Sequence, residues 1–348
     1  MKRQWLDILV GTKPLPEDIL ERAELLEFAD SHHVLGQMAE VWKDTATGKT
    51  RDVFDNGLLR ARFDRNMLRN EMERVERAFM GTGLSPILIK GASYVAQGLD
   101  AGKGRRVSDI DILLHEDEIG QAEELLKAAG WAFDEATDNT YDQNYYRTKM
   151  HELPPLRHKT RRTIIDVHFK LLPRTSRTKV QSDLFIDAAL PLEGRKLRVF
   201  TAADRLLHSA IHSFADGSFD TPARSLIELK YLFADIQEAE HEGLLARAKT
   251  VGAVLPLAYA LWALAEFFKD PLALGLLEKS GVKPSRLICW TISHKLEHID
   301  TAPFAKALLY IRSHYMRMSL PQLFWHLATK SFRRIKPQPE LPLPPGFQ

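Results

Sequence analysis

Two aspartates separated by one residue, Asp109 and Asp111, stand in the apolar segment Val107-Ser108-Asp109-Ile110-Asp111-Ile112-Leu113-Leu114. In a β-strand, residues i and i+2 project from the same face, so both carboxylates would point in one direction. Adjacent like charges raise each other's pKa unless a cation lies between them, and Mg²⁺ prefers oxygen ligands. The pair therefore indicates a Mg²⁺ site. A turn followed by an exposed edge strand is the alternative for an isolated Asp-x-Asp.

Upstream, the apolar run Pro86-Ile87-Leu88-Ile89 is of strand type and leads into Lys90-Gly91-Ala92-Ser93-Tyr94, which could open a helix. A strand, a glycine turn and a helix N-terminus together make a phosphate cradle. The glycine would let the backbone approach a ligand closely, and the free N–H groups would favour an anion. Lys90 would either neutralise phosphate charge or simply face water.

Downstream, the segment Thr163-Ile164-Ile165-Asp166-Val167-His168-Phe169 alternates apolar and polar residues, which predicts another strand. It offers a third carboxylate, Asp166, inside that strand. The alternative is a structural aspartate bonded to neighbouring backbone or to His168, which shares its face. A lone histidine is more often structural, so His168 is not assigned as a catalytic base.

In this order, the segments resemble the nucleotidyltransferase superfamily of the DNA polymerase β type. That superfamily carries a glycine-serine motif at a helix start, an Asp-x-Asp or Asp-x-Glu pair on the next strand and a third carboxylate on a later strand. Ile89-Lys90-Gly91, Arg106-x-Ser108-Asp109-Ile110-Asp111-Ile112-Leu113 and Ile165-Asp166-Val167-His168 look more narrowly like a bacterial family known as uncharacterised nucleotidyltransferases. The resemblance covers roughly residues 85–235.

The resemblance implies an α+β fold, with a small mixed β-sheet and its helices forming the nucleotidyltransferase core between helical N- and C-terminal regions. We expect a helical N-terminal region at 1–82, the catalytic core at 83–200, a helical C-terminal domain at 201–335 and a Pro-rich tail at 336–348. In the first region, the spacing of Leu59, Phe63, Met67 and Met72 suits an amphipathic helix. Further helices are expected at 118–129, 202–214, 222–239, 244–249 and 255–268.

The implied activity is transfer of a nucleoside monophosphate from a nucleoside triphosphate (NTP) to a hydroxyl acceptor by a two-metal mechanism. Asp109 and Asp111 would hold both Mg²⁺ ions, with Mn²⁺ as the alternative metal. Asp166 would bind the metal beside the acceptor and help the hydroxyl lose its proton. Nucleotide binding is assigned to Lys90, Gly91, Ser93, Arg106 and Ser108. ATP is the default NTP.

The chain departs from the superfamily pattern in two places, and the loosened glycine-serine motif favours an alternative function. Ala92 separates Gly91 from Ser93, which loosens the glycine-serine motif, and the interval from Gly91 to Asp109 is long. The alternative is a catalytically inactive protein of this fold that binds a nucleotide or a partner. If the chain is active, its acceptor is a small molecule or sugar, a protein side chain or an RNA end.

Charge and composition narrow the class of protein. The formal net charge is only +2, so RNA is the less favoured acceptor, although basic residues at 157–162 could hold a triphosphate or a polyanion. The 348 residues, 45% hydrophobic, allow two or three modest domains. Cys289 is the only cysteine, which excludes an internal disulfide and a cysteine-rich zinc site. We expect no membrane association and a cytoplasmic location, because no membrane span or signal peptide is apparent.

Three residues at helical spacing in the C-terminal region, Asp204, His208 and His212, could bind a metal on one face. Three ligands on a single helix make a weak site. We therefore expect this helix to be structural, and the resemblance suggests that it packs on the catalytic core near the acceptor pocket.

Overall fold

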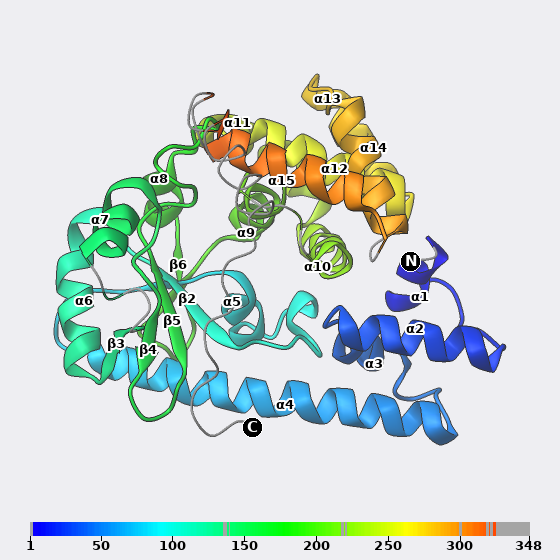
Figure 1. Ribbon diagram of the computed structural model, residues 1–348, viewed down its shortest axis with the longest axis horizontal. Coiled ribbons are helices and arrows are strands. Elements are labelled where there is room, and N and C mark those ends of the chain that lie inside the picture. The colour runs from blue at the N-terminus through cyan, green and yellow to red at the C-terminus, as the bar shows by residue number, and fades with distance from the viewer. Residues whose placement is uncertain are drawn as a thin grey trace, which may run out of the picture.

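The computed structural model describes residues 3–134, 138, 140–216, 219, 221–298, 301–317, 320 and 323–324. Within them, a mixed β-sheet lies between helices from both ends of the chain, and the long helix α4 (Gly48–Ala78) runs along the sheet (Figure 1). The expected α+β class, with helical regions on both sides of a mixed sheet, is confirmed. The tail predicted at 336–348 lies outside the described residues.

The bounds of the described elements follow the chain. The other N-terminal helices are α1 (Gln4–Leu9), α2 (Ile19–Ser31) and α3 (Leu35–Trp42). The strands are β1 (Ile87–Leu88), β2 (Asp109–Leu113), β3 (Trp131–Phe133), β4 (Leu156–His158), β5 (Ile164–His168), β6 (Leu190–Pro191) and β7 (Arg198–Val199). Between them lie α5 (Lys90–Ala96), α6 (Ile119–Ala128), α7 (Thr140–Lys149), α8 (Ser182–Asp187) and the 3₁₀ turns η1 (Asp100–Gly102) and η2 (Glu116–Glu118).

The described residues of the C-terminal region form helices and the short connections between them. Its elements are α9 (Ala202–Ile211), the π-helical turn η3 (His212–Asp216), α10 (Pro222–Ala234), the 3₁₀ turn η4 (Glu238–Glu240), α11 (His241–Val251), α12 (Val254–Phe268), α13 (Pro271–Ser280), α14 (Arg286–Glu297) and α15 (Pro303–Arg317). The helices expected from 202 onward are present with shifted ends. Among the helices that the structure describes, none is both long and apolar enough to cross a membrane.

Strand order in the sheet is β3-β4-β5-β2-β1-β7-β6. Two pairs, β2 with β5 and β1 with β7, run parallel, and the remaining neighbours run antiparallel. The aspartate strand β2 is therefore central, with β1 on one side and β5 on the other. This position brings the glycine turn after β1 and the third carboxylate on β5 to the same strand.

Both faces of β2 are buried, in different cores. Ile110 and Ile112 pack in a cluster that includes Met72 of α4 and Leu126 of α6. Leu113 belongs instead to the larger cluster, which is formed mainly by the N- and C-terminal helices. Because side chains alternate along a strand, Asp109 and Asp111 share the face of Leu113. The two carboxylates therefore face the C-terminal helices, while the opposite face rests on α4 and α6.

Helix α4 buries a different stripe from the one expected. Leu59 and Phe63 are 62% and 65% exposed, whereas Ala61, Leu68 and Met72 are buried. The prediction was wrong for the first two residues. The tertiary contacts of α4 select the helix face, because Gly57 lets it lie close to Leu35 of α3 while the second half packs on the sheet.

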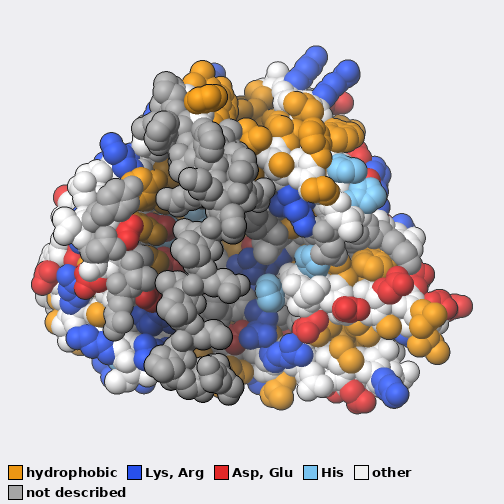
Figure 2. All heavy atoms as spheres, in the orientation of Figure 1, with side chains coloured by type: hydrophobic (Ala, Val, Ile, Leu, Met, Phe, Trp, Pro, Cys, Tyr) orange, Lys and Arg blue, Asp and Glu red, His pale blue; other side chains and the backbone are white. Residues whose placement is uncertain are grey.

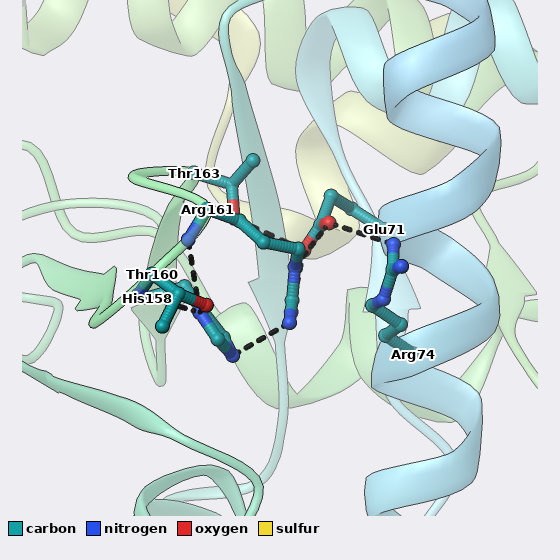
Figure 3. A network of polar contacts seen from close by, with 6 residues as sticks. All are labelled: Glu71, Arg74, His158, Thr160, Arg161 and Thr163. Atoms are coloured by element: carbon teal, nitrogen blue, oxygen red, sulfur yellow. Dashed lines mark hydrogen bonds and ion pairs between the residues drawn. The ribbon is translucent and has the colours of Figure 1, made fainter.

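A buried carboxylate fastens the turn between β4 and β5 to α4 (Figure 3). Arg161 Nε donates to Glu71 Oε1 at 2.7 Å, and Thr163 Oγ1 donates to Glu71 Oε2 at 3.0 Å. Arg74 adds a third contact from α4 itself. Burial raises the pKa of Glu71, but the hydrogen bonds from Arg161 and Thr163 outweigh it and hold this pKa below its usual value. Arg161, which the sequence offered for a polyanion, is thus engaged within the fold.

Replacing Glu71 by glutamine should weaken this attachment. Glu71→Gln keeps the shape of the side chain but leaves the Arg161 guanidinium without its carboxylate, so the free energy of unfolding should fall by about 2 kcal/mol. Urea denaturation measures the change. The matched control is Glu73→Gln on the same helix, whose exposed carboxylate lies 3.8 Å from Arg195; its effect should stay below about 1 kcal/mol. Equal effects would contradict a special role for Glu71.

Candidate active site

The glycine turn and the aspartate strand meet at an ion pair. Ile89 N donates to the carbonyl oxygen of Asp111 at 3.1 Å, which extends the β1–β2 pairing to the start of α5. The chain then turns at Lys90, whose φ of 52° lies in the left-handed region. This conformation costs a non-glycine residue about 1–2 kcal/mol. It places Lys90 Nζ 2.6 Å from Asp111 Oδ1.

The third carboxylate lies beside Asp111. In the parallel pairing of β2 with β5, Asp111 stands opposite Asp166, so their side chains leave the same face of the sheet. His168 Nε2 lies 3.0 Å from Asp111 Oδ1, and His168 Nδ1 lies 3.3 Å from Glu152 Oε2. The alternative pairing of Asp166 with His168 is absent from the described residues, and Asp166 Oδ1 is buried without a hydrogen-bond partner there.

The pKa values of the three buried aspartates are shifted differently, because their charged neighbours differ. For Asp111, the positive charge of Lys90 and the hydrogen bond from His168 outweigh burial and hold its pKa below the usual value. Burial and the Asp111 charge raise the pKa of Asp109. Burial, Asp111 and Glu152 together raise the pKa of Asp166 to about 7. The cluster therefore holds more negative charge than the neighbouring cations compensate.

A cleft of about 220 Å³ opens in front of the aspartate pair. Of the predicted site residues, it is lined by Lys90, Gly91, Arg106, Ser108, Asp109 and Asp111. The opposite wall comes from α9, η3 and α10 and includes His208, His212, Arg224 and Glu228. Figure 2 shows Lys, Arg and His side chains gathered near the middle of the viewed face. The expected packing of a C-terminal helix against the catalytic core is thus present.

Two predicted residues do not line the cleft. Ser93 is 1% exposed, and its Oγ accepts a hydrogen bond from Gln97 Nε2 at 2.9 Å within α5. Asp166 lies next to Asp111 in the sheet but is not part of the cleft wall. The structure therefore brings together the aspartate pair, Lys90 and Gly91, with Asp166 beside them, and leaves Ser93 in the interior.

Arg105 is a cleft residue that the sequence interpretation missed. Its guanidinium packs so closely on Gly91 that a Cβ at position 91 would lie 1.7 Å from Arg105 Nη1. Glu228 on α10 accepts from Arg105 Nε at 2.7 Å and holds it there. The left-handed turn falls on Lys90, so the absence of a Cβ at Gly91 makes room for Arg105. The spacing of Arg224 and Glu228, one helical turn apart, was an available signal that these two residues share a face.

The histidine helix does not form the three-residue metal site considered from its spacing. Asp204 is turned away and accepts two hydrogen bonds of 2.8 Å from Arg247. His208 is buried edge-on against Phe200, with 5.5 Å between ring centroids. Burial lowers the pKa of His208 well below 6.5, and the charge of His212 is the second largest cause of this lowering. His208 is therefore a neutral part of the cleft wall.

A different group of metal-binding residue types lies on the other side of Asp111. One ligand atom each from His151, Glu152 and His168 lies within 4.8 Å of the others. His168 also contacts Asp111, so this group is continuous with the aspartate cluster. The negative charge of Glu152 in this group contributes to the raised pKa of Asp166.

Neutralising Asp166 should stabilise the metal-free protein in a pH-dependent way. Its pKa is about 7 in the folded state and 3.8 ordinarily, so the folded state binds the extra proton between these values. The contribution of Asp166 to stability therefore falls as pH rises through this window. Asp166→Asn should raise the melting temperature in EDTA by several degrees at about pH 8 and by much less at about pH 5. The control is Asp100→Asn, at an exposed ion pair with Lys103. A pH-independent difference would contradict the prediction.

Comparison with known proteins identifies the family of the chain. No curated protein matches the chain. A family model described as uncharacterised nucleotidyltransferase matches residues 20–269 of the 348, a range that includes the sheet, the cleft and helices on both sides of it. The match is wider than the expected 85–235, because it includes α2 to α4 and extends to α12. The chain therefore belongs to the uncharacterised nucleotidyltransferase family.

Proposed function

We propose that the protein transfers a nucleoside monophosphate from an NTP, with ATP as the first candidate, to a hydroxyl acceptor. The observation that carries the proposal is the register of β2 with β5, which sets Asp166 beside Asp111 while Asp109 and Asp111 face a cleft. Family membership supports the reaction class. The proposed acceptor is a small molecule or a protein side chain, and an RNA end is less favoured because Arg161 is engaged with Glu71.

The donor set fits a divalent cation. Among the described residues, Asp166 Oδ1 is buried without a hydrogen-bond partner, and the pKa values of both Asp109 and Asp166 are raised, first by burial and then by the Asp111 charge. Carboxylate oxygens of this kind suit Mg²⁺ or Mn²⁺. Asp109, Asp111 and Asp166 are the residues that would hold the metal, which when bound supplies neutralisation of the phosphate charge.

In the proposed reaction, the acceptor oxygen forms a bond to the α-phosphorus, and the bond from that phosphorus to the bridging oxygen of pyrophosphate breaks. The acceptor proton is proposed to pass to Asp166, which stands beside Asp111 in the sheet. His168 is proposed to keep Asp111 in position through its 3.0 Å contact. Lys90 would exchange its contact with Asp111 for one with a phosphate oxygen.

Loss of the aspartate pair should abolish transfer. Purified protein incubated with each α-labelled NTP, Mg²⁺ and fractionated cell extract should label one fraction, and Asp109→Asn/Asp111→Asn should lower the rate by at least about 100-fold. Asp100→Asn, at an exposed carboxylate, is the control. Equal labelling by the two variants would refute the proposal. Nucleotide binding without any labelling would instead support the inactive alternative.

Metal binding can be tested without knowing the acceptor. Mg²⁺ or Mn²⁺ should raise the melting temperature of the native protein, because a ligand that binds only the folded state stabilises it. The shift should be lost in Asp109→Asn/Asp111→Asn and retained in Asp100→Asn. The same shift in all three proteins would place the metal elsewhere.

A further inference from the structure

The end of the cleft beside Gly91 has an excess of positive charge. Arg105 and Arg224 face the same carboxylate oxygen, because Glu228 Oε1 lies 2.7 Å from Arg105 Nε and 3.8 Å from Arg224 Nε. All three side chains line the cleft. Burial lowers the pKa of Arg224 even with Glu228 beside it. One carboxylate is therefore shared by two guanidinium groups in a partly desolvated place.

Both guanidiniums keep hydrogen-bond donors for a ligand. Arg105 Nη1 also donates to the carbonyl oxygen of Arg106 at 3.2 Å, and Arg224 Nη2 donates to Thr221 Oγ1 at 3.3 Å. A guanidinium carries five N–H donors, so several have no acceptor among the described residues. Its planar fork matches the oxygens of a phosphate. An anion with several phosphate oxygens fits this end of the cleft.

The side chains on the two sides of the aspartate pair carry charges of opposite sign. On the side of β1 lie Gly91 and the two arginines, which act on the pKa of Asp109 or feel its charge. On the side of β5 lie Asp166 and Glu152. In phosphoryl-type transfer, the attacking and leaving oxygens lie roughly in line on opposite sides of the phosphorus. A leaving pyrophosphate is favoured on the cationic side, and a hydroxyl losing its proton is favoured on the acidic side.

We propose that Arg105 and Arg224 bind the β- and γ-phosphates of the NTP. This inference rests on the proposed nucleotidyl transfer. It also sets the orientation of the reactants in the cleft: pyrophosphate leaves at the Gly91 end, and the acceptor enters from the side of Asp166. Arg105 precedes the aspartate strand, whereas Arg224 lies on α10. The C-terminal helices are therefore part of the nucleotide site, and the nucleotide phosphates link them to the sheet.

Inorganic tripolyphosphate is the sharpest probe, because its binding depends on neither the base nor the acceptor. By calorimetry in Mg²⁺, Arg224→Ala should weaken tripolyphosphate binding about 10- to 100-fold, as expected for the loss of charged hydrogen bonds. In the same variant, AMP, which lacks the β- and γ-phosphates, should bind with an affinity changed by less than about twofold. Arg224→Lys, which keeps the charge but lacks the planar fork, should fall between the native protein and the alanine variant.

The matched control is Lys230→Ala. Lys230 is a cation on the same helix, its ammonium lies 4.9 Å from the Phe268 ring, and it does not line the cleft. Its loss should leave tripolyphosphate affinity unchanged. Arg224→Lys also serves if the alanine variant does not fold, since full native affinity in the lysine variant together with a folded circular dichroism spectrum would overturn the role of the fork.

Other outcomes separate this inference from the reaction itself. Unchanged tripolyphosphate affinity in Arg224→Ala overturns the inference even when the protein transfers label. An equal loss of AMP affinity also overturns it, because AMP lacks the β- and γ-phosphates that the arginines are proposed to bind. Selective loss of tripolyphosphate binding in a protein that never transfers label supports the phosphate site and refutes only the proposed activity.

Discussion

The buried charge of Asp111 is the constraint on which the rest of the site depends. The residue is 4% exposed, and a carboxylate taken out of water is tolerated only when it is paired and hydrogen-bonded. Lys90 and His168 provide this pairing from the segments on either side of β2. The left-handed backbone at Lys90 and the in-register pairing of β2 with β5 are both conditions for those two contacts.

This arrangement also explains how differently the three aspartates are placed. Asp111 is locked among protein partners, Asp109 borders the cleft, and Asp166 carries an oxygen with no partner in the described part of the chain. A cluster in which one carboxylate is fully compensated and two are not keeps its geometry while retaining capacity for added positive charge. Such preorganisation limits the rearrangement that a bound cation would require to the contact between Lys90 and Asp111.

The local features of the site could be predicted from the sequence, but its long-range partners could not. The alternation around Asp109 and Asp111 and the apolar runs on each side identify β2, β1 and β5, because strand periodicity is a short-range property. The orientation of Ser93 depends on how a short helix packs, which its spacing does not encode. The pairing of Arg105 with Glu228 joins residues 123 positions apart. No local pattern distinguishes that arginine from its neighbour Arg106.

Runs of basic residues in the sequence were the least informative signal for locating the site. Residues 157–162 look like a surface that binds a polyanion. In the structure, however, Arg161 pairs with Glu71 on a helix distant in sequence, and Arg157 pairs with Asp134 at 3.1 Å. Conversely, the lysine and arginines that line the cleft come from three separate segments, and only Arg105 and Arg106 among them are neighbours in the sequence. A basic cluster in space and a basic cluster in sequence are therefore different observations in this protein.

The close packing of Arg105 on Gly91 has a consequence for how this site can change over evolutionary time. A side chain at position 91 would collide with the guanidinium, so substitution there requires the end of the Arg105 side chain to move from its place beside Glu228. Loss of Arg105, by contrast, requires no prior change at position 91 and opens space for one. The two positions are thus coupled, and relatives with a larger residue at 91 should have a smaller or differently oriented residue at 105.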